Sequence, residues 1–233
     1  MSDLFEPFLR ATEIVDWTDP IVRMAAQRLA EGLTDRVTIA RRCFEFVRDN
    51  IQHSSDYKRN PVTCTASETL EAGTGYCYAK SHLLAALLRG NGIPAGFCYQ
   101  RLSVDETGPP FCLHGLNAIY LAEFGWYRVD ARGNRPGIDA QFCPPIERLA
   151  FRLNLPEERD FFEILSAPHP KVIEALRGLS DWAELLQNLP DWEQPSLTTD
   201  SRRGLAPDTS RAHSRIIGKT VPESGCRSAG TRL

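Results

Sequence analysis

The chain of 233 residues is long enough for one domain with appendages, because a domain averages roughly 150 residues. Its composition, 42% hydrophobic and 24% charged, is ordinary for a globular protein and excludes a wholly disordered chain. The net charge of −3, without a basic stripe in the body of the chain, argues against a dedicated nucleic-acid binder. No apolar run reaches the roughly 18 residues that span a bilayer, and residues 1–6 lack the pattern of a signal peptide, so we expect a cytoplasmic protein with no membrane partner.

The seven cysteines are an odd-numbered set without a C-x-x-C pair. In a reducing compartment such cysteines are typically free thiols that pack as small apolar residues. A structural zinc site needs closely spaced ligand pairs, and the nearest candidate, Cys112-x-His114, has the wrong spacing. No glycine-rich nucleotide fingerprint follows a predicted strand either, so we expect no metal and no cofactor. The cysteines are Cys43, Cys64, Cys77, Cys98, Cys112, Cys143 and Cys226.

The first third of the chain predicts helices. Apolar residues recur at helical spacing over 19–29, where a proline occupies the first helical position, and again over 34–51, where Thr34 is the expected cap. The polar stretch 52–61 predicts a loop, and 67–70 predicts a short helical turn. This segment therefore supplies helices to the fold and no strands.

The middle of the chain changes from a helix to strands. Residues 78–89 are apolar almost all round and predict a buried helix that begins at or beside Cys77 and ends at the glycines of 90–92. Short segments rich in β-branched and aromatic residues follow, separated by turn residues that suit an antiparallel meander. The predicted strands are 94–104, 113–121 and 126–131.

After Pro144-Pro145 the pattern is mixed, and two further helices are expected. One runs from Pro170 to Gly178, and the other is capped by Ser180 and ends before Pro190. Helices and antiparallel strands segregated along the chain predict an α+β fold rather than a doubly wound parallel sheet.

Cys77 has the surroundings that a catalytic thiol needs. It follows the turn Gly73-Thr74-Gly75 and lies in the first turn of the buried helix, where unpaired N–H groups and the helix dipole favour a negative sulfur. The glycines let the backbone turn tightly and let a substrate approach. The Cys77 N–H is also a ready donor to an oxyanion.

His114 and Asp130 are the expected base and its orienting partner. His114 begins one strand, and Asp130 lies in the next strand, among Trp, Tyr and Val, where an unpaired acid is costly. A three-residue loop, 122–124, would pair Leu121 with Gly125. In that register His114 is diagonal to Asp130 on one face of the hairpin, close enough for a hydrogen bond.

Three motifs together resemble the bacterial transglutaminase-like domain proteins. They are Gly-Thr-Gly-Tyr-Cys-Tyr-Ala-Lys at 73–80, Leu-His-Gly-Leu-Asn-Ala at 113–118 and Gly-Trp-Tyr-Arg-Val-Asp-Ala at 125–131, and the resemblance covers roughly 60–150. It implies a papain-like transglutaminase core, in which N-terminal helices and a buried nucleophile helix pack on a small antiparallel sheet. It also implies a catalytic triad of Cys77, His114 and Asp130.

On this resemblance we divide the chain into three parts. Residues 1–60 are the N-terminal helical part of the domain, and 61–195 are the catalytic core with its C-terminal helices. Residues 196–233 contain no aromatic residue and carry a net charge of +4, so we expect a disordered basic tail.

The resemblance leaves two positions of the site open. The second oxyanion donor is expected in the upstream polar loop, from Gln52, His53 or Tyr57. The family often carries an aromatic residue two positions after the histidine of its triad, where this chain has Leu116. The aromatic beside the site is therefore expected from elsewhere, and the candidates are Tyr76, Tyr78 and Trp126.

Proteins of this superfamily attack a peptide or carboxamide carbonyl and pass the acyl group from a thioester to water or an amine. We favour hydrolysis of a peptide, protein or amide substrate, because a reducing cytoplasm and the lack of a calcium-loop motif fit it better than extracellular cross-linking. The alternatives are a protein-glutamine acyltransferase or deamidase, and a non-catalytic interaction module on the same fold.

Overall fold

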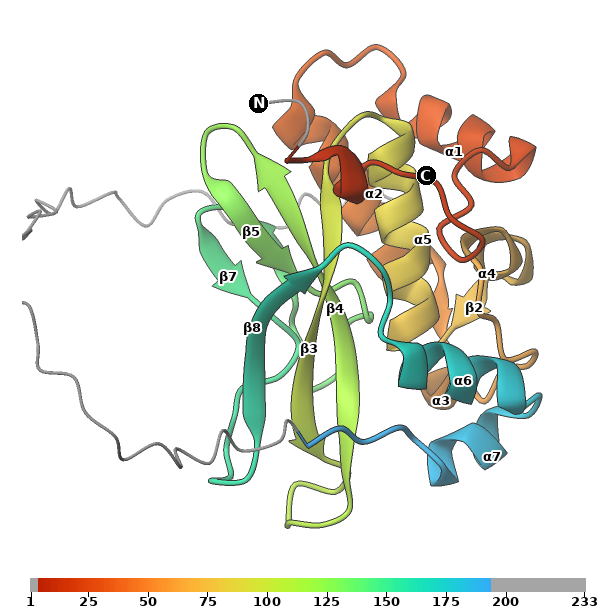
Figure 1. The fold of residues 1–233 in the computed structure, drawn as a ribbon, viewed down its shortest axis with the longest axis vertical. Coiled ribbons are helices and arrows are strands. Elements are labelled where there is room, and N and C mark those ends of the chain that lie inside the picture. Colours follow the sequence, from red (N-terminus) through yellow and green to blue (C-terminus); the bar gives the residue numbers. More distant parts are fainter. Residues whose placement is uncertain (1–3, 194–233) are drawn as a thin grey trace, which may run out of the picture. The chain divides into compact units, whose positions relative to one another are not determined.

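The computed structural model describes residues 4–193, which group helices against a four-stranded antiparallel sheet (Figure 1). The arrangement is α+β, as the sequence predicts. Helices α1 (Pro20–Ala30) and α2 (Arg36–Asn50) pack on α5 (Cys77–Gly90) together with α4 (Ala66–Ala72), so the N-terminal helices share one core with the helix that begins at Cys77. The predicted tail, 196–233, lies outside the described residues.

Aspartate side chains start several of the helices. Asp19 accepts a hydrogen bond from the N–H of Ile21 at the start of α1. The caps of α2 and α7 are Asp35 and Asp181, one residue later than the predicted Thr34 and Ser180, because each carboxylate accepts two first-turn N–H groups. The main helices are α1 (Pro20–Ala30), α2 (Arg36–Asn50), α4 (Ala66–Ala72), α5 (Cys77–Gly90), α6 (Pro170–Gly178) and α7 (Trp182–Gln187), with a 3₁₀ turn η1 at Glu6–Phe8.

The polar stretch that was predicted as a loop contains regular structure. Strand β1 (Gln52–His53) pairs in parallel with β2 (Thr74–Gly75), and helix α3 (Ser54–Tyr57) follows it. This short ladder was missed because two residues carry no periodicity. Its consequence is functional, since it brings the upstream polar segment beside the residues that lead into Cys77.

Helix α5 is the centre of the core. Every residue from Cys77 to Arg89 is buried, and the helix contacts α1, α2, α4 and β4. Even Lys80 is fully buried, and its Nζ donates hydrogen bonds to the carbonyls of Ile51 and Arg48. Asn117 on β4 donates to the Ser81 carbonyl and so ties the sheet to the helix.

The sheet order is β5-β4-β3-β8, and its hairpin register is the one that the sequence predicts. Leu121 pairs with Gly125 and Asn117 with Val129, so the three-residue loop places even-numbered residues of both strands on one face. The strands are β3 (Ala95–Ser103), β4 (Phe111–Leu121), β5 (Gly125–Val129) and β8 (Arg159–Leu165), and β6 (Gln141–Cys143) pairs with β7 (Ile146–Arg148).

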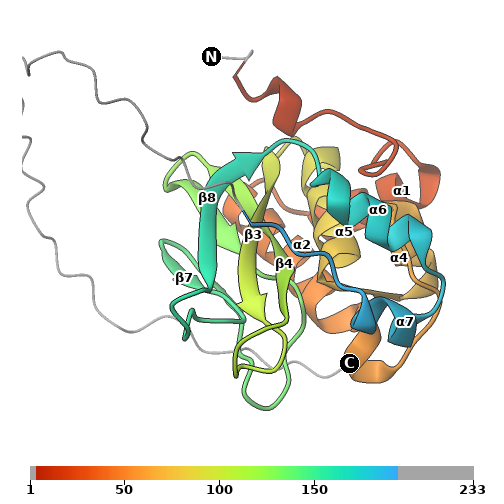
Figure 2. The same cartoon turned by 60° about the horizontal axis from the view of Figure 1, so that its bottom comes forward.

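Strand β8 extends the predicted three-stranded meander to four strands, and it lies next to β3 in Figure 2. Sequence reasoning missed it because its Phe161-Phe162 pair breaks the alternation of a half-buried strand. Phe161 packs into the core, whereas Phe162 is 82% exposed.

Among residues 4–193, no helix is both long and apolar enough to cross a bilayer. Within residues 4–193, five cysteines are free thiols and Cys143 is not, so the expectation of free thiols is wrong for Cys143. The free ones are Cys43, Cys64, Cys77, Cys98 and Cys112.

Gly115 sets how closely β4 approaches α5, because a side chain at this position would meet Tyr78 of the helix. A Cβ at this position would lie 2.9 Å from Tyr78 Cδ1 and 3.4 Å from Tyr78 Cα. We expect Gly115→Ala to lower the free energy of unfolding by about 1–3 kcal/mol, because the strand must move away from the helix. Urea unfolding measures this, with Gly178→Ala as control, since a Cβ there meets nothing within 4 Å. An unchanged midpoint in Gly115→Ala would show that the approach is not tight.

Candidate active site

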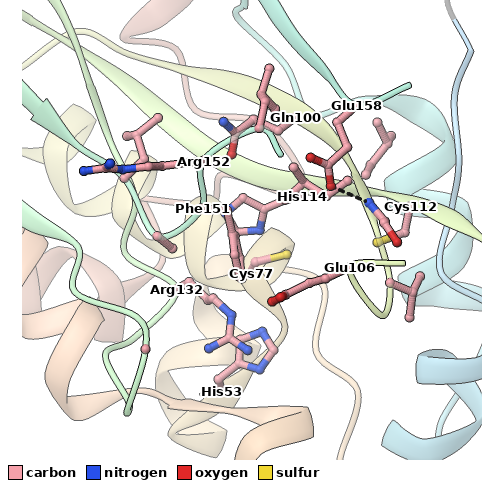
Figure 3. Close-up of a pocket in the computed structure, with 18 of the residues that line it drawn as sticks. His53, Cys77, Gln100, Glu106, Cys112, His114, Arg132, Phe151, Arg152 and Glu158 are labelled. Carbon is pink, nitrogen blue, oxygen red and sulfur yellow. Dashed lines mark hydrogen bonds between the residues drawn. The ribbon is translucent and has the colours of Figure 1, made fainter. Parts of the chain in front are cut away.

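A cavity of 1190 Å³ lies between one face of the sheet and the chain that follows β6. Its walls include the start of α5, residues of β3 and β4, and the whole of 146–154. Figure 3 shows Cys77, His114 and Phe151 together in it, with His53 and Arg132 beside them. The cavity therefore gathers residues that are far apart in the sequence.

Cys77 is the first residue of α5. The side chain of its cap residue, Tyr76, makes no hydrogen bond to the first turn, so no cap side chain accepts from the backbone N–H groups of that turn. The Cys77 side chain lines the cavity although the residue is only 7% exposed. A thiolate at this position would gain from the positive end of the helix dipole.

His114 on β4 is held by Asp130, which directly follows the last residue of the neighbouring strand β5. His114 Nε2 lies 2.7 Å from Asp130 Oδ2, and both residues are buried. This contact follows from the hairpin register, which places the two residues diagonally on one face. Burial by itself lowers the pKa of His114, but the charges and hydrogen bonds of Asp130 and Cys77 outweigh it and raise the pKa to about 10. The surroundings of His114 therefore favour the protonated imidazolium form at neutral pH.

Asp130 is fully buried, and its carboxylate accepts three hydrogen bonds. Oδ1 accepts from the Arg132 N–H at 3.1 Å, and Oδ2 accepts from the Ala150 N–H at 3.0 Å in addition to His114. Burial raises the pKa of Asp130, but His114 and these N–H groups hold it below its usual value. The carboxylate stays charged and fixes the orientation of the His114 ring.

Of the three upstream donor candidates, the structure places only His53 at the cavity. Its Nδ1 lies 3.0 Å from Ser55 Oγ, and its ring meets the Tyr76 ring edge-on at 5.4 Å. Burial, helped by the positive charge of Arg132, lowers the pKa of His53 well below its ordinary value, so this ring is neutral. Gln52 and Tyr57 do not line the cavity, and Tyr57 is 59% exposed.

The aromatic neighbours differ in part from the expected ones. Tyr76 and Tyr78 line the cavity, whereas Trp126 does not. Trp126 shares the face of Asp130 but lies four residues away, about 14 Å along the strand, where it packs against Phe8.

The aromatic that covers the base is Phe151, whose ring meets the His114 ring edge-on at 4.9 Å. Sequence reasoning missed Phe151 because it follows the last predicted strand, in a segment without periodicity. No local pattern marks it.

A buried ion pair closes the side of the cavity near His53. The guanidinium of Arg132 binds both carboxylate oxygens of Asp56, at 2.6 and 2.9 Å. Arg132 is only 7% exposed, and Arg135 lies 3.6 Å from the same carboxylate. This ion pair links helix α3 to the segment that carries Asp130, and it therefore helps to hold Asp130 in place. Within residues 4–193, no group of three potential metal ligands comes together.

The site is that of a thiol with an adjacent imidazolium and a buried carboxylate, and a family comparison agrees with it. Residues 23–131, which include Cys77, His114 and Asp130, match the family model described as the transglutaminase-like superfamily. The chain therefore carries a transglutaminase-like domain. The match begins within α1, well before the 60–150 covered by the motifs, so the N-terminal helices belong to the same domain.

Solved structures with partial similarity come from two bacteria. One is a candidate cysteine protease from Cytophaga hutchinsonii, with 19% identity and a TM-score of 0.46 over 57% of this chain and 43% of that one. Another is the periplasmic domain of TgpA from Pseudomonas aeruginosa, with 17% identity and a TM-score of 0.40 over 53% of this chain and 45% of that one. The chain thus covers less than half of either structure. No curated protein matches it.

Proposed function

We propose that the protein is a cysteine-nucleophile enzyme that cleaves a peptide or amide bond through a thioester acyl-enzyme. The observation that carries the proposal is the arrangement of Cys77 at the start of α5, in the same cavity as the His114 imidazolium, which a fully buried Asp130 holds at 2.7 Å. A cysteine that served only as packing would need neither partner.

The chemistry begins with attack of the Cys77 thiolate on the substrate carbonyl, which forms a C–S bond and an oxyanion. The oxyanion collapses, the C–N bond breaks, and His114 gives its proton to the departing amine. Neutral His114 then takes a proton from water, whose oxygen attacks the thioester. The C–S bond breaks, the acid is released, and the thiolate–imidazolium pair is restored.

The Cys77 N–H and His53 are the proposed oxyanion donors. The hydroxyl of Ser55 can donate to His53 Nδ1, which leaves the proton of the neutral ring on Nε2 as a donor. We expect His53→Ala to lower the turnover number for amide cleavage by roughly 100-fold, and His53→Asn to restore part of the loss because its amide also donates. Steady-state kinetics measures both. Equal losses in the two variants would assign His53 a structural role.

Water is the proposed acyl acceptor in the cleavage of a peptide or amide. The first alternative is a protein-glutamine acyltransferase, which passes the acyl group to an amine, or a deamidase, which hydrolyses a side-chain carboxamide. A non-catalytic interaction module is the second alternative. A cytoplasmic location, and substrates that are neither nucleic acid nor membrane, are part of the proposal and rest on the sequence composition.

Intact-protein mass spectrometry tests the proposal. The chain is incubated with a mixture of short peptides and quenched in acid, which preserves a thioester. We expect an acyl adduct on Cys77 that disappears in Cys77→Ala and persists in Cys112→Ala, since Cys112 lines the same cavity without a helix start behind it. Adding an amine during the incubation distinguishes hydrolysis from transfer. If no adduct forms and Cys77 alkylates no faster than Cys112, the interaction-module alternative takes its place.

A further inference from the structure

Gln100 on β3 is a buried polar side chain that the triad does not use. It is 2% exposed and lines the cavity. Its Oε1 is buried with no hydrogen-bond partner, and within residues 4–193 no protein group bonds to its amide nitrogen either. Because nearly all buried polar groups in proteins are paired, an unpaired carboxamide at a cavity wall requires an explanation.

Two other buried side chains have an unpaired atom, and the contrast is informative. His82 binds the Cys64 carbonyl through Nδ1, and Asn117 binds the carbonyls of Ser81 and Gly96 through Nδ2. Both therefore hold the fold together with the rest of their polar atoms, and neither lines the cavity. Gln100 is the only one of these three residues whose side chain makes no hydrogen bond to the protein, and it is the only one that lines the cavity.

Gln100 lies directly beside the base. In the ladder between β3 and β4 it pairs with His114, and in the ladder between β3 and β8 it pairs with Asp160. All three residues line the cavity, so they form a row across one face of the sheet. Figure 3 shows Gln100 on one side of the His114 ring and Cys77 on the other. A substrate that reaches from the thiol past the base would meet the Gln100 carboxamide.

A carboxamide has one acceptor and one donor end, which is the complement of a peptide group. The two ends of Gln100 are interchangeable by rotation, so the side chain can meet either an N–H or a carbonyl. Asp160, which pairs with Gln100 across the sheet, does not compete for this carboxamide, because Arg128 already binds Asp160 at 2.5 Å. Gln100 is therefore preorganised for an amide group and poorly suited to an apolar one.

We propose that Gln100 is a substrate-binding residue that hydrogen-bonds a peptide group on the leaving side of the scissile bond. This rests on the proposed function, in which His114 gives its proton to the leaving amine. The substrate class that follows is a peptide whose chain continues beyond the cleaved bond, rather than a side-chain carboxamide that releases ammonia. An ester at the contacted position would leave the buried carboxamide unpaired and would bind less well.

Bromoacetyl peptides test the assignment, because Cys77 displaces bromide from a methylene whose peptide extends in the direction of the leaving group. The probes are bromoacetyl-Ala-Ala-amide and the two depsipeptides in which one backbone N–H is replaced by an ester oxygen. Each alkylation rate of Cys77 is divided by the rate of the same probe with glutathione. We expect the peptide to react roughly 10-fold faster than one depsipeptide, as one hydrogen bond would give.

In Gln100→Met this preference is expected to fall below about 2-fold, whereas Gln27→Met, the same change at an exposed position of α1, retains it. A preference that survives in Gln100→Met overturns the assignment, and so does equal reaction of all three probes in the unmodified chain. If no probe alkylates Cys77 selectively, the proposed function itself fails.

Stability supplies a second readout that does not depend on the probes. Methionine fills the same volume without an unpaired polar group, so we expect the melting temperature of Gln100→Met to equal or exceed that of the unmodified chain. A drop of several degrees, with no such drop in Gln27→Met, would show that Gln100 serves the fold and would contradict a substrate-binding role.

Discussion

Replacing Asp130 with asparagine is expected to slow alkylation of Cys77 by iodoacetamide roughly 100-fold at pH 6, where an ordinary thiol is almost entirely protonated. The charge of Asp130 is the largest of the influences that raise the pKa of His114 against the cost of burial, and Cys77 adds to it. Without the carboxylate, burial favours the neutral ring, and a neutral ring does not stabilise a thiolate at Cys77. The amide also offers its N–H₂ to His114, which favours the wrong tautomer.

Mass spectrometry of the labelled peptides measures the alkylation rate, and nitrogen-15 spectra of the histidine ring report its charge. Asp139→Asn is the matched control, since Asp139 lines the same cavity but its hydrogen bonds are to Asn134 and Gln141. Retention of fast labelling in Asp130→Asn, or a charged His114 ring in that variant at pH 7, would contradict the assigned role of the carboxylate.

We expect the free energy of unfolding to depend on pH through two buried groups, His114 and Lys80, whose contributions have opposite signs. The folded-state pKa of His114 is about 10, above its ordinary value, so its contribution is complete below pH 6.5 and is lost as the pH rises to 10. Burial, with a smaller effect from Arg132, lowers the pKa of Lys80 to about 7. Between pH 7 and 10.5 the unfolded state therefore binds the extra proton at Lys80, and stability there rises with pH.

The two contributions oppose each other between pH 7.5 and 8.5, where Lys80 makes the free energy of unfolding rise with pH and His114 makes it fall. Thiols also titrate in the unfolded state in this window, because burial raises the folded-state pKa of Cys43, Cys98 and Cys112 to about 12. Comparison with the unmodified chain isolates Lys80: the free energy of unfolding of Lys80→Met should fall, relative to that of the unmodified chain, by about 1.4 kcal/mol per pH unit. Urea unfolding at several pH values measures both slopes, with the exposed Lys58→Met as control. Parallel profiles of Lys80→Met and the unmodified chain would contradict the contribution assigned to Lys80.

The core of the site could be predicted because its geometry follows from local rules. Gly73 and Gly75 mark a break before an apolar run, and in the structure Gly73 ends α4 and β2 precedes α5, which puts Cys77 at a helix start. The loop of three residues after Leu121 fixes the hairpin register, and the register fixes which residues share a face with His114. These inferences need only the sequence and the period of each element.

Other features depend on contacts that no local pattern contains. Trp126 has the right parity for the site, yet it lies at the far end of the strand, beneath the N-terminal 3₁₀ turn. Phe151 reaches His114 from a segment without periodicity, and its neighbour Ala150 donates to Asp130. The position of Gln100 beside His114 depends on the register between β3 and β4, whose connecting loop of seven residues does not define one pairing.

The central claim is that His114 and Asp130 keep Cys77 reactive, and the pH profile of alkylation tests it most directly. Cys112 lines the same cavity, and burial raises its pKa to about 12, so it serves as an internal reference in the same sample. We expect Cys77 to be labelled by iodoacetamide at pH 6 while Cys112 stays unlabelled, and we expect His114→Ala to abolish this selectivity. If Cys77 and Cys112 are labelled in parallel as the pH rises, the thiol is not activated and the proposed enzymatic function is contradicted.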